Sequence, residues 1–594
     1  MIFGKHINKY YIRYGWMILI GVLSLVAVDF TQLKIPELYR MVINGMTTGQ
    51  VETAEGLMAF NMDFLLDKIC LPVIIIMAIV VSGRFLWRIC LFGSAVNVNR
   101  DLRYEMFDHA KDLSQQYYHM NKVGGLMSLF TNDLETVQDC FGEGILTLVD
   151  ALTLGIMSFV KMFMMNKIMT LFAMVPMLFM FGITTLVGFK LTKKWDERQQ
   201  KFSDLSDFSQ ESFTGIAVIK AFAKEVKEIH AFRKLNHANE KVNIEYTRLS
   251  MLMDILITLF VESVIAVILG YGGYLVYIGS FNGGQLVEFI GYFTSIIWPV
   301  LAIGILVEQH ARGTASLKRI SEFLDAKINV KDGEKANLHP DPEIRGKIEF
   351  RHLDFTFPAS ERHILKDVSF TIEAGENAAV FGRTGSGKTT IVDLIARTYN
   401  VPDGTIFVDG IDVNEMTIRD LRSHIAYVPQ DNFLFSDTIA RNIAFTSDEP
   451  DIALVTEAAK MAGVDDNIQE FPEKYETVLG ERGVTVSGGQ KQRISIARAL
   501  MRNSEILILD DSVSAVDTRT EKEILDHLRS IRKGKTTILI AHRVSTIEHM
   551  DKIIVIDEGR IIDVGTHAEL YDRCELYRDA VERQRLEDLR KERG

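Results

Sequence analysis

The first part of the chain alternates long apolar runs with polar stretches, and the second part contains shorter apolar runs of strand length. Two of the long runs contain no charged residue, and three others carry only one or two charges. A helix needs about 20 mainly apolar residues to cross a bilayer. The pattern predicts six membrane-spanning helices, at residues 16–28 (extended past Asp29 toward Pro36), 69–90, 144–165, 168–188, 255–278 and 289–307.

Lys and Arg are unevenly distributed among the segments that join these spans. They occur before the first span and in the long connections between spans two and three and between spans four and five. Residues 45–67 and 279–284 contain none. Because cytoplasmic loops carry an excess of Lys and Arg, we expect a multi-pass protein of the cell membrane with both termini in the cytoplasm. Asp29, Lys34 and Pro36 do not suit a cleavable signal peptide.

Two arginines lie inside the second predicted span, one helical turn apart. Arg84 and Arg88 could line a cavity that accepts anionic cargo. Alternatively, they could snorkel toward the membrane surface or pair with carboxylates of other spans, namely Asp29, Asp150 or Glu262.

A glycine-rich segment in the second part matches the phosphate-binding loop pattern. It follows the apolar run 378–381 and precedes residues with helical spacing, which is the strand-to-helix context that this motif requires. Lys388 is expected to reach the β- and γ-phosphates of ATP, and Thr389 to bind Mg²⁺. The predicted ATP-binding residues of this loop are Gly382, Arg383, Thr384, Gly385, Ser386, Gly387, Lys388, Thr389 and Thr390.

Two carboxylates, Asp510 and Asp511, follow the apolar run 506–509. Such a run is typical of a strand buried on both faces. Open α/β sheets bind ligands at the carboxyl ends of their strands, so these residues are expected near the phosphate loop. Asp510 is therefore a predicted Mg²⁺ ligand.

The motifs, with the segment Val486-Ser487-Gly488-Gly489-Gln490, resemble the nucleotide-binding domain of ABC transporters. In that family two such domains dimerise head to tail, and each ATP lies between one phosphate loop and the signature of the other domain. Val486 stands where the family usually has Leu. The resemblance implies that Ser487, Gly488, Gly489 and Gln490 contact an ATP held by a partner.

The resemblance assigns further residues in the order that the family has them. It implies that Phe357 stacks on adenine where the family usually has Tyr, and that Gln430 contacts Mg²⁺ and water. It also implies that His542 is the switch histidine. Residues 514–517 resemble the family's D-loop, and residues 479–483 resemble the loop that touches the membrane domain in exporters.

The polar connections between the spans resemble the intracellular extensions of six-helix ABC exporters. Coupling helices are expected near residues 115–119 and 206–210. The implied architecture is multi-domain, with an all-α six-helix transmembrane domain followed by an α/β P-loop NTPase domain of ABC type. The expected boundaries are 1–325 for the transmembrane domain, 326–343 for a polar linker and 344–594 for the nucleotide-binding domain.

One residue departs from the family pattern. The family places Glu, its catalytic base, where this chain has Asp511. Asp is one methylene shorter, which withdraws the carboxylate by about 1.5 Å, and a misplacement of that size can cost roughly a hundredfold in rate. We expect a site that binds MgATP and hydrolyses it slowly, with Asp511, His542 and Gln430 as its catalytic residues. Alternatively, a shifted backbone lets Asp511 act as the base.

The chain has no internal repeat, so it resembles an exporter-type half-transporter, an ABC-type ATPase coupled to transport. Some heterodimeric bacterial ABC exporters contain one subunit with a degenerate ATP site, which lacks the catalytic Glu. With Asp511, this chain resembles that subunit, and its partner would carry the catalytic Glu. The expected function is ATP-driven export of a small or amphipathic substrate by alternating access. Two alternatives are a regulatory ATP-binding subunit without a pump role and an importer on the exporter fold, as in metal-chelate uptake. A net charge of −12 argues against nucleic acid as the main partner.

Overall fold

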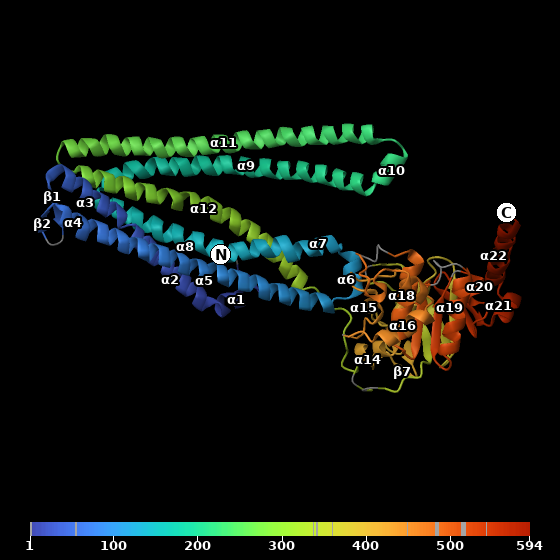
Figure 1. Ribbon diagram of the computed structural model, residues 1–594. Coiled ribbons are helices and arrows are strands. Elements are labelled where there is room, and N and C mark those ends of the chain that lie inside the picture. Colours follow the sequence, from blue (N-terminus) through green and yellow to red (C-terminus); the bar gives the residue numbers. More distant parts are fainter. Residues whose placement is uncertain are drawn as a thin grey trace. The chain divides into compact units, whose positions relative to one another are not determined.

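The computed structural model describes residues 3–53, 56–336, 338–339, 342–358, 360–447, 449–480, 486–512, 518–541 and 543–593. Its internal contacts divide the chain into two units, shown in Figure 1. We call Met1–Lys111 with Val123–Ala326 the helical unit, and Asp112–Lys122 with Lys327–Gly594 the α/β unit.

The helical unit contains six stretches that are long and apolar enough to cross a membrane, among the described residues. The prediction of six apolar helices is therefore confirmed. Its helices are α1 (Asn8–Arg13), α2 (Gly15–Gln32), α3 (Ile35–Thr48), α4 (Met62–Phe64), α5 (Leu71–Asp112), α7 (Val123–Ser128), α8 (Leu134–Met165), α9 (Lys167–Thr214), α10 (Ile216–Ala221), α11 (Glu225–Tyr277) and α12 (Gly283–Leu324), with π-helical turns at Leu65–Cys70 and Leu129–Asp133.

The first apolar stretch consists of two helices. It breaks between α2 and α3, and Pro36 stands in the first turn of α3, where a missing backbone N–H costs nothing. Gly49, with a φ of 69°, ends α3. An antiparallel hairpin follows, in which β1 (Gln50–Thr53) pairs with β2 (Gly56–Ala59).

Several ionic side chains inside the helical unit are paired. The Lys161 ammonium lies 2.6 Å from Glu37, and the Arg40 guanidinium lies 3.0 Å from the buried carboxylate of Glu288. Tyr292, which is fully buried, donates a hydrogen bond of 3.0 Å to Glu288. Pairing of this kind is required because an isolated charge in an apolar interior is costly.

The two arginines of the second predicted span make contacts that the sequence did not single out. Arg84 donates a hydrogen bond of 3.2 Å to Gln32, and the Arg88 guanidinium lies 5.3 Å from the ring centroid of Trp87. Two of the carboxylates considered as their partners accept hydrogen bonds from other residues. Asp29 accepts a hydrogen bond from Thr153, and Asp150 accepts one from Trp298.

Of the two segments expected to form short coupling helices, one is a separate short helix and the other is not. Residues 115–119 lie in a short separate helix, α6 (Gln115–Met120), which belongs to the α/β unit by its contacts. The expectation of a short helix at residues 206–210 is wrong, because α9 continues through them. No Gly or Pro interrupts the chain between residues 189 and 214, and the helix ends only at Gly215. The short helix that follows is α10.

The α/β unit is built on two sheets. A six-stranded sheet has the order β12-β11-β5-β10-β9-β8, with parallel pairing except for the edge strand β12. A four-stranded antiparallel sheet has the order β4-β3-β6-β7. The strands are β3 (Ile348–Thr356), β4 (His363–Ile372), β5 (Asn377–Gly382), β6 (Ile406–Val408), β7 (Ile411–Asp412), β8 (Ile425–Val428), β9 (Ile506–Asp510), β10 (Thr536–Ile540), β11 (Lys552–Asp557) and β12 (Arg560–Gly565).

Helices complete this unit, and its six-stranded sheet carries the apolar core. All five residues of β9 are buried, as its continuous apolar run predicts. The helices are α13 (Lys388–Ile395), α14 (Ile418–Ser423), α15 (Ile439–Ile443), α16 (Ile452–Met461), α17 (Asp465–Gln469), α18 (Gly488–Met501), α19 (Thr518–Ile531), α20 (Val544–Ile547), α21 (His567–Arg573) and α22 (Glu575–Arg593).

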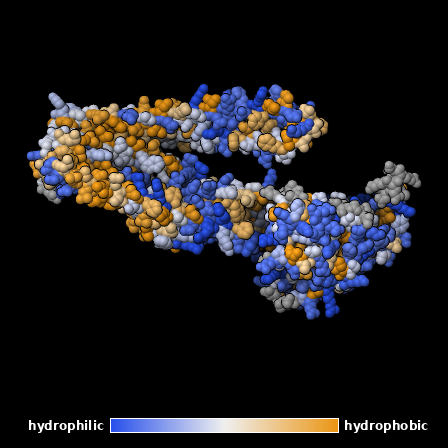
Figure 2. Space-filling view, in the orientation of Figure 1, coloured by the Kyte–Doolittle hydropathy of each residue, from blue (hydrophilic) through white to orange (hydrophobic). Residues whose placement is uncertain are grey.

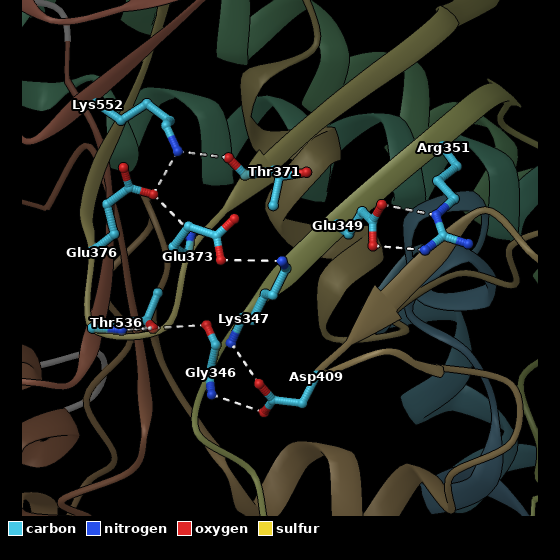
Figure 3. A network of polar contacts seen from close by, with 11 residues as sticks. Gly346, Lys347, Glu349, Arg351, Thr371, Glu373, Glu376, Asp409, Thr536 and Lys552 are labelled. Carbon is cyan, nitrogen blue, oxygen red and sulfur yellow. Dashed lines mark hydrogen bonds and ion pairs between the residues drawn. The ribbon is translucent and has the colours of Figure 1, made fainter.

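Polar contacts join the two sheets (Figure 3). The Thr536 hydroxyl of β10 donates to the Gly346 carbonyl at 2.7 Å, and the Gly346 N–H donates to Asp409 at 2.9 Å. Lys552 of β11 donates to the Thr371 carbonyl of β4 at 3.0 Å. These bonds satisfy backbone groups that the strand ladders leave open.

The polar segment predicted as a linker is hydrogen-bonded to the α/β unit. Arg397 donates to the Lys331 carbonyl at 3.2 Å, and Asn400 donates to the Asn329 carbonyl at 2.6 Å. Asp332 accepts a hydrogen bond of 2.7 Å from the N–H of Ile418, at the start of α14. These residues therefore belong structurally to the α/β unit, whose contacts begin at Lys327.

Candidate functional site

The glycine-rich segment forms the turn between β5 and α13, the context that the phosphate-loop motif requires. Gly385 and Gly387 have φ angles of 79° and 104°, which residues with a side chain rarely adopt. A Cβ added to Gly382 would lie 2.0 Å from the Ile556 carbonyl oxygen of the neighbouring strand β11. Glycine is needed at these positions because of backbone conformation and close strand packing.

Lys388 begins α13 and is buried, with 6% of its surface exposed. Its Nζ donates hydrogen bonds of 2.9 Å to the carbonyl oxygens of Gly382 and Arg383. Burial lowers the pKa of Lys388, and the negative charges of Asp510 and Asp511 oppose that shift. The structure thus places a cation within the loop, beside two carboxylates.

A cavity of about 360 Å³ opens beside the loop. Most of the predicted nucleotide-binding residues line it, although they come from segments far apart in the sequence. The lining residues are Phe357, Arg362, Ile364, Thr384, Gly385, Gly387, Lys388, Thr389, Thr390, Gln430, Asp510, Asp511 and Ile540.

Three of these lining residues were missed by sequence reasoning. Ile540 ends β10, which pairs with both β5 and β9, so sheet topology brings it to the site. Arg362 and Ile364 lie just before and within β4. Their nearness in sequence to Phe357 is the only signal that could have indicated them.

Asp510 and Asp511 occupy the carboxyl end of β9, as predicted. Asp510 is 1% exposed. Asp511 has a φ of 48°, a left-handed conformation that Asp tolerates better than most side chains. Its backbone N–H donates a hydrogen bond of 3.0 Å to the Ile540 carbonyl, which anchors this conformation.

The oxygen atoms around the cavity are of the type that Mg²⁺ requires. Thr389, Gln430 and Asp510 supply a hydroxyl, an amide carbonyl and a carboxylate. No group of three or more His, Cys, Asp or Glu residues that could hold a metal occurs among the described residues. Mg²⁺ is commonly held by one or two protein ligands together with substrate phosphates, so this donor set fits a phosphate-bound Mg²⁺.

A third carboxylate, Asp393 of α13, lies behind this site and was not predicted. Its Oδ1 accepts a hydrogen bond of 3.4 Å from the Tyr427 hydroxyl of β8. Burial, with a contribution from the charge of Asp510, raises the pKa of Asp393 to about 6. It therefore adds negative charge beside the cavity at neutral pH.

The signature segment forms the start of α18. Ser487 Oγ accepts a hydrogen bond from the Gln490 N–H at 3.3 Å, and Gln490 Oε1 accepts one from the Ser487 N–H at 2.9 Å. This reciprocal capping box defines the N-terminus of α18. The four signature residues are absent from the described lining of the phosphate-loop cavity. The structure does not bring this predicted group into the same site.

Three of the predicted segments cannot be placed. His542, residues 481–483 and residues 514–517 lie outside the described residues. The residues after His542 are held by two other helices. Arg543 forms an ion pair of 3.0 Å with the buried Glu521 of α19, and the Val544 N–H donates to Gln584 of α22 at 2.6 Å.

Comparisons with known proteins agree with this architecture. Residues 18–300 match the ABC transporter transmembrane region, and residues 365–514 match the ABC transporter family model. The chain is 37% identical over 584 residues to the probable multidrug resistance ABC transporter ATP-binding/permease protein YheI of Bacillus subtilis (strain 168). This match covers 98% of this chain and 97% of that relative. It is 35% identical over 581 residues to the multidrug resistance-like ATP-binding protein MdlA of Escherichia coli (strain K12), with 98% and 96% covered.

A solved structure supports the same fold. The structure of a bacterial Atm1-family ABC exporter with ATP bound is similar to this chain, with a TM-score of 0.76 and 26% sequence identity. The similarity covers 97% of this chain and 99% of that one. The chain therefore belongs to the ABC transporter family and has the exporter fold, as a half-transporter that joins a transmembrane region and an ATP-binding domain.

Proposed function

We propose that this chain exports small or amphipathic substrates by ATP-driven alternating access, as one half of a dimer. The observation that carries the proposal is the separation of two nucleotide-binding elements. The phosphate loop, Gln430 and Asp510 share one cavity, whereas Ser487 and its signature helix do not line it. Each ATP would then lie between the phosphate loop of one chain and the signature of another.

Family membership implies ATP binding and an ATPase activity coupled to transport. The direction of transport is inferred from the relatives. Two are named multidrug resistance proteins, and the similar structure is titled an exporter. The helical unit, with its six apolar stretches, would lie in the cell membrane, and the ATP-binding domain and both termini in the cytoplasm.

In the proposed mechanism the phosphate loop and Lys388 hold the triphosphate, and the ring of Phe357 stacks on the adenine. Bound Mg²⁺ would neutralise charge on the phosphates, with Thr389, Gln430 and Asp510 as its protein ligands. Asp511 would orient the attacking water from the end of β9, and His542 would assist at the γ-phosphate. ATP binding closes the two ATP-binding domains, and this closure shifts the membrane domains to the outward-open state.

We further propose that the dimer contains two different chains. Asp511 stands where the family has a catalytic Glu, and its shorter side chain would slow hydrolysis at this site. The Ser487–Gln490 helix start, with its complete capping box, would serve the faster site of the partner. A partner with Glu after its own metal-binding Asp would then perform most of the hydrolysis.

Coexpression with candidate half-transporters tests the proposal. The chain should co-purify with one partner, and the pair should take up a fluorescent amphipathic substrate into inverted membrane vesicles when ATP is present. After nucleotide trapping, one ATP should remain at the Asp511 site while the partner's site turns over. A homodimer of this chain with full transport-coupled ATPase would refute the heterodimer. Flux in the reverse direction would indicate an importer, and ATP binding without flux would indicate a regulatory subunit.

A further inference from the structure

Basic and aromatic residues gather where α9 and α11 pass from apolar to polar sequence. The charge-free part of α9 ends at Lys190, and the apolar part of α11, which carries only Glu262, begins after Asp254. The two helices pack against each other within the helical unit (Figure 1). Figure 2 shows their surface changing, about halfway toward α10, from mainly hydrophobic to a mixture of hydrophilic and hydrophobic residues. The residues just beyond this change would lie at the level of lipid headgroups.

One arginine in this region lies against two aromatic rings that also contact each other. The Arg198 guanidinium lies 5.0 Å from the ring centroid of Trp195 on α9 and 5.1 Å from that of Tyr246 on α11. The ring centroids of Trp195 and Tyr246 are 5.5 Å apart. Cation–π contacts of this kind orient the guanidinium without neutralising it.

The charge of Arg198 is not compensated within the described part of the chain, in contrast to its neighbours. Lys194 lies 2.8 Å from Glu197 and 2.7 Å from Glu245. Lys201 lies 3.0 Å from Asp204. No carboxylate or hydrogen-bond partner is found for Arg198 among the described residues.

Further exposed cations surround this arginine. Lys190 and Lys193 lie on α9, eight and five residues before Arg198, and Arg248 lies on α11 two residues after Tyr246, where its charge also acts on Glu245. We call Lys190, Lys193, Trp195, Arg198, Tyr246 and Arg248 the α9–α11 cluster. Counting the carboxylates between them, residues 190–201 and 241–248 carry seven Lys or Arg and three Asp or Glu, an excess of four positive charges.

We propose that the α9–α11 cluster binds the phosphate group of an anionic phospholipid. Arg forms paired hydrogen bonds to phosphate oxygens, and Trp and Tyr favour the membrane–water interface. The additional lysines favour a lipid with net negative charge over a zwitterionic one. The proposal rests on the membrane placement given under the proposed function, and it adds a lipid ligand that this function does not require.

Lipid retention by the full-length transporter tests this assignment. The purified complex is equilibrated with phosphatidylglycerol and phosphatidylcholine, and the lipids that remain bound are counted by native mass spectrometry. The unaltered chain should retain phosphatidylglycerol in preference. Arg198→Gln should reduce this preference about fivefold, the equivalent of roughly 1 kcal/mol for one cation near a membrane surface. Arg198→Lys, which keeps the charge, should lose less.

The control is Lys227→Gln, which removes an exposed cation near the start of α11, far from Tyr246. It should leave the lipid preference unchanged. Equal retention of both lipids by the unaltered chain would overturn the proposal. An Arg198→Gln variant that unfolds at a lower temperature but keeps the lipid preference would also overturn it. Arg198 would then act only in holding α9 against α11. Displacement of the lipid by millimolar inorganic phosphate would instead assign a site for soluble anions. Transport assays are separate, so loss of export would not alter the lipid result.

Discussion

The Nζ of Lys388 lies 2.9 Å from the carbonyl oxygen of Gly382. Lys388 begins α13, and its cation therefore binds back to the phosphate loop that precedes this helix. The same Nζ donates to the Arg383 carbonyl. Carbonyl groups of the loop thus fix the position of this buried ammonium. Its two protein bonds are with neutral acceptors, which leaves the positive charge available to phosphate.

Replacing Lys388 with Ala should weaken ATP binding at this site by about 10–100-fold, since hydrogen bonds to charged groups contribute about 1.5–3 kcal/mol. Titration of the complete transporter with a fluorescent ATP analogue measures the effect. Lys533→Ala removes an exposed cation after α19 and should leave the affinity unchanged. Equal affinities of the Lys388→Ala and unaltered proteins would contradict the assignment of the phosphate loop.

Replacing Asp511 with Glu should accelerate hydrolysis at this site by up to about a hundredfold, because the carboxylate would reach the attacking water. ATP affinity should change little. Asp511→Asn keeps the side-chain length and suits the φ of 48°, but removes the base, so it should slow the reaction further. Single-turnover hydrolysis, with the partner's catalytic base removed, isolates this site. An unchanged rate in Asp511→Glu would mean that side-chain length does not limit the reaction.

Replacing Ser487 with Ala should slow hydrolysis at the partner's site while ATP binding at the Lys388 site persists. The loss of the cap should also destabilise α18 by about 1 kcal/mol. Thr566→Ala is the matched control, because Thr566 forms the same capping box with Glu569 at the start of α21. Both variants should melt slightly earlier. If they lowered ATPase activity equally, the role of Ser487 would be structural only.

Replacing Asp393 with Asn should stabilise the protein at neutral pH. The native pKa of about 6 lies above the unfolded value of about 3.9, so the folded state binds more protons between these values. Ionised Asp393 therefore destabilises the fold by about 1–3 kcal/mol above pH 6, and this cost is relieved as the pH falls toward 4. Thermal unfolding of the nucleotide-free protein should show a gain for Asp393→Asn at pH 7.5 that is roughly halved at pH 5. A gain independent of pH would contradict this origin.

Replacing Arg40 with Ala should destabilise the helical unit by about 3–5 kcal/mol, since it leaves the buried Glu288 carboxylate without its cation. The double variant with Glu288→Ala should recover much of this loss. Detergent-solubilised proteins can be compared by thermal unfolding in a double-mutant cycle. Additive losses from the two single substitutions would show that the pair does not interact.

Sequence periodicity was sufficient for the six apolar helices and for the strand–loop–helix context of Lys388, because both depend on local pattern. The pairing of charges inside the helical unit was not predictable in this way. Glu37 contacts Lys161 on a helix more than 120 residues away, and no local pattern selects that partner over others. The extent of α9 also differed from expectation, because the family resemblance placed a short helix where the chain has no helix-breaking residue before Gly215.

The candidate site was predictable where a motif names the residue, as for Gln430 and Asp510. Asp393 and Arg362 escaped because neither belongs to a motif of recognisable spacing. The position of Arg362 depends on how β4 packs beside the phosphate loop, and the contact of Asp393 depends on Tyr427 of β8. The left-handed backbone of Asp511 is likewise a property of the sheet edge, where its N–H meets the Ile540 carbonyl, and the identity of the residue alone does not reveal it.

Ser487 and Gln490 complete each other's hydrogen bonds within the chain, so the cap of α18 is formed by the signature residues themselves. A second ATP-binding domain that binds at Ser487–Gln490 would meet a helix start whose cap is already formed. Dimer closure would then lose little conformational entropy at this helix. Its rate would depend mainly on diffusion and orientation of the two domains, and only weakly on local refolding.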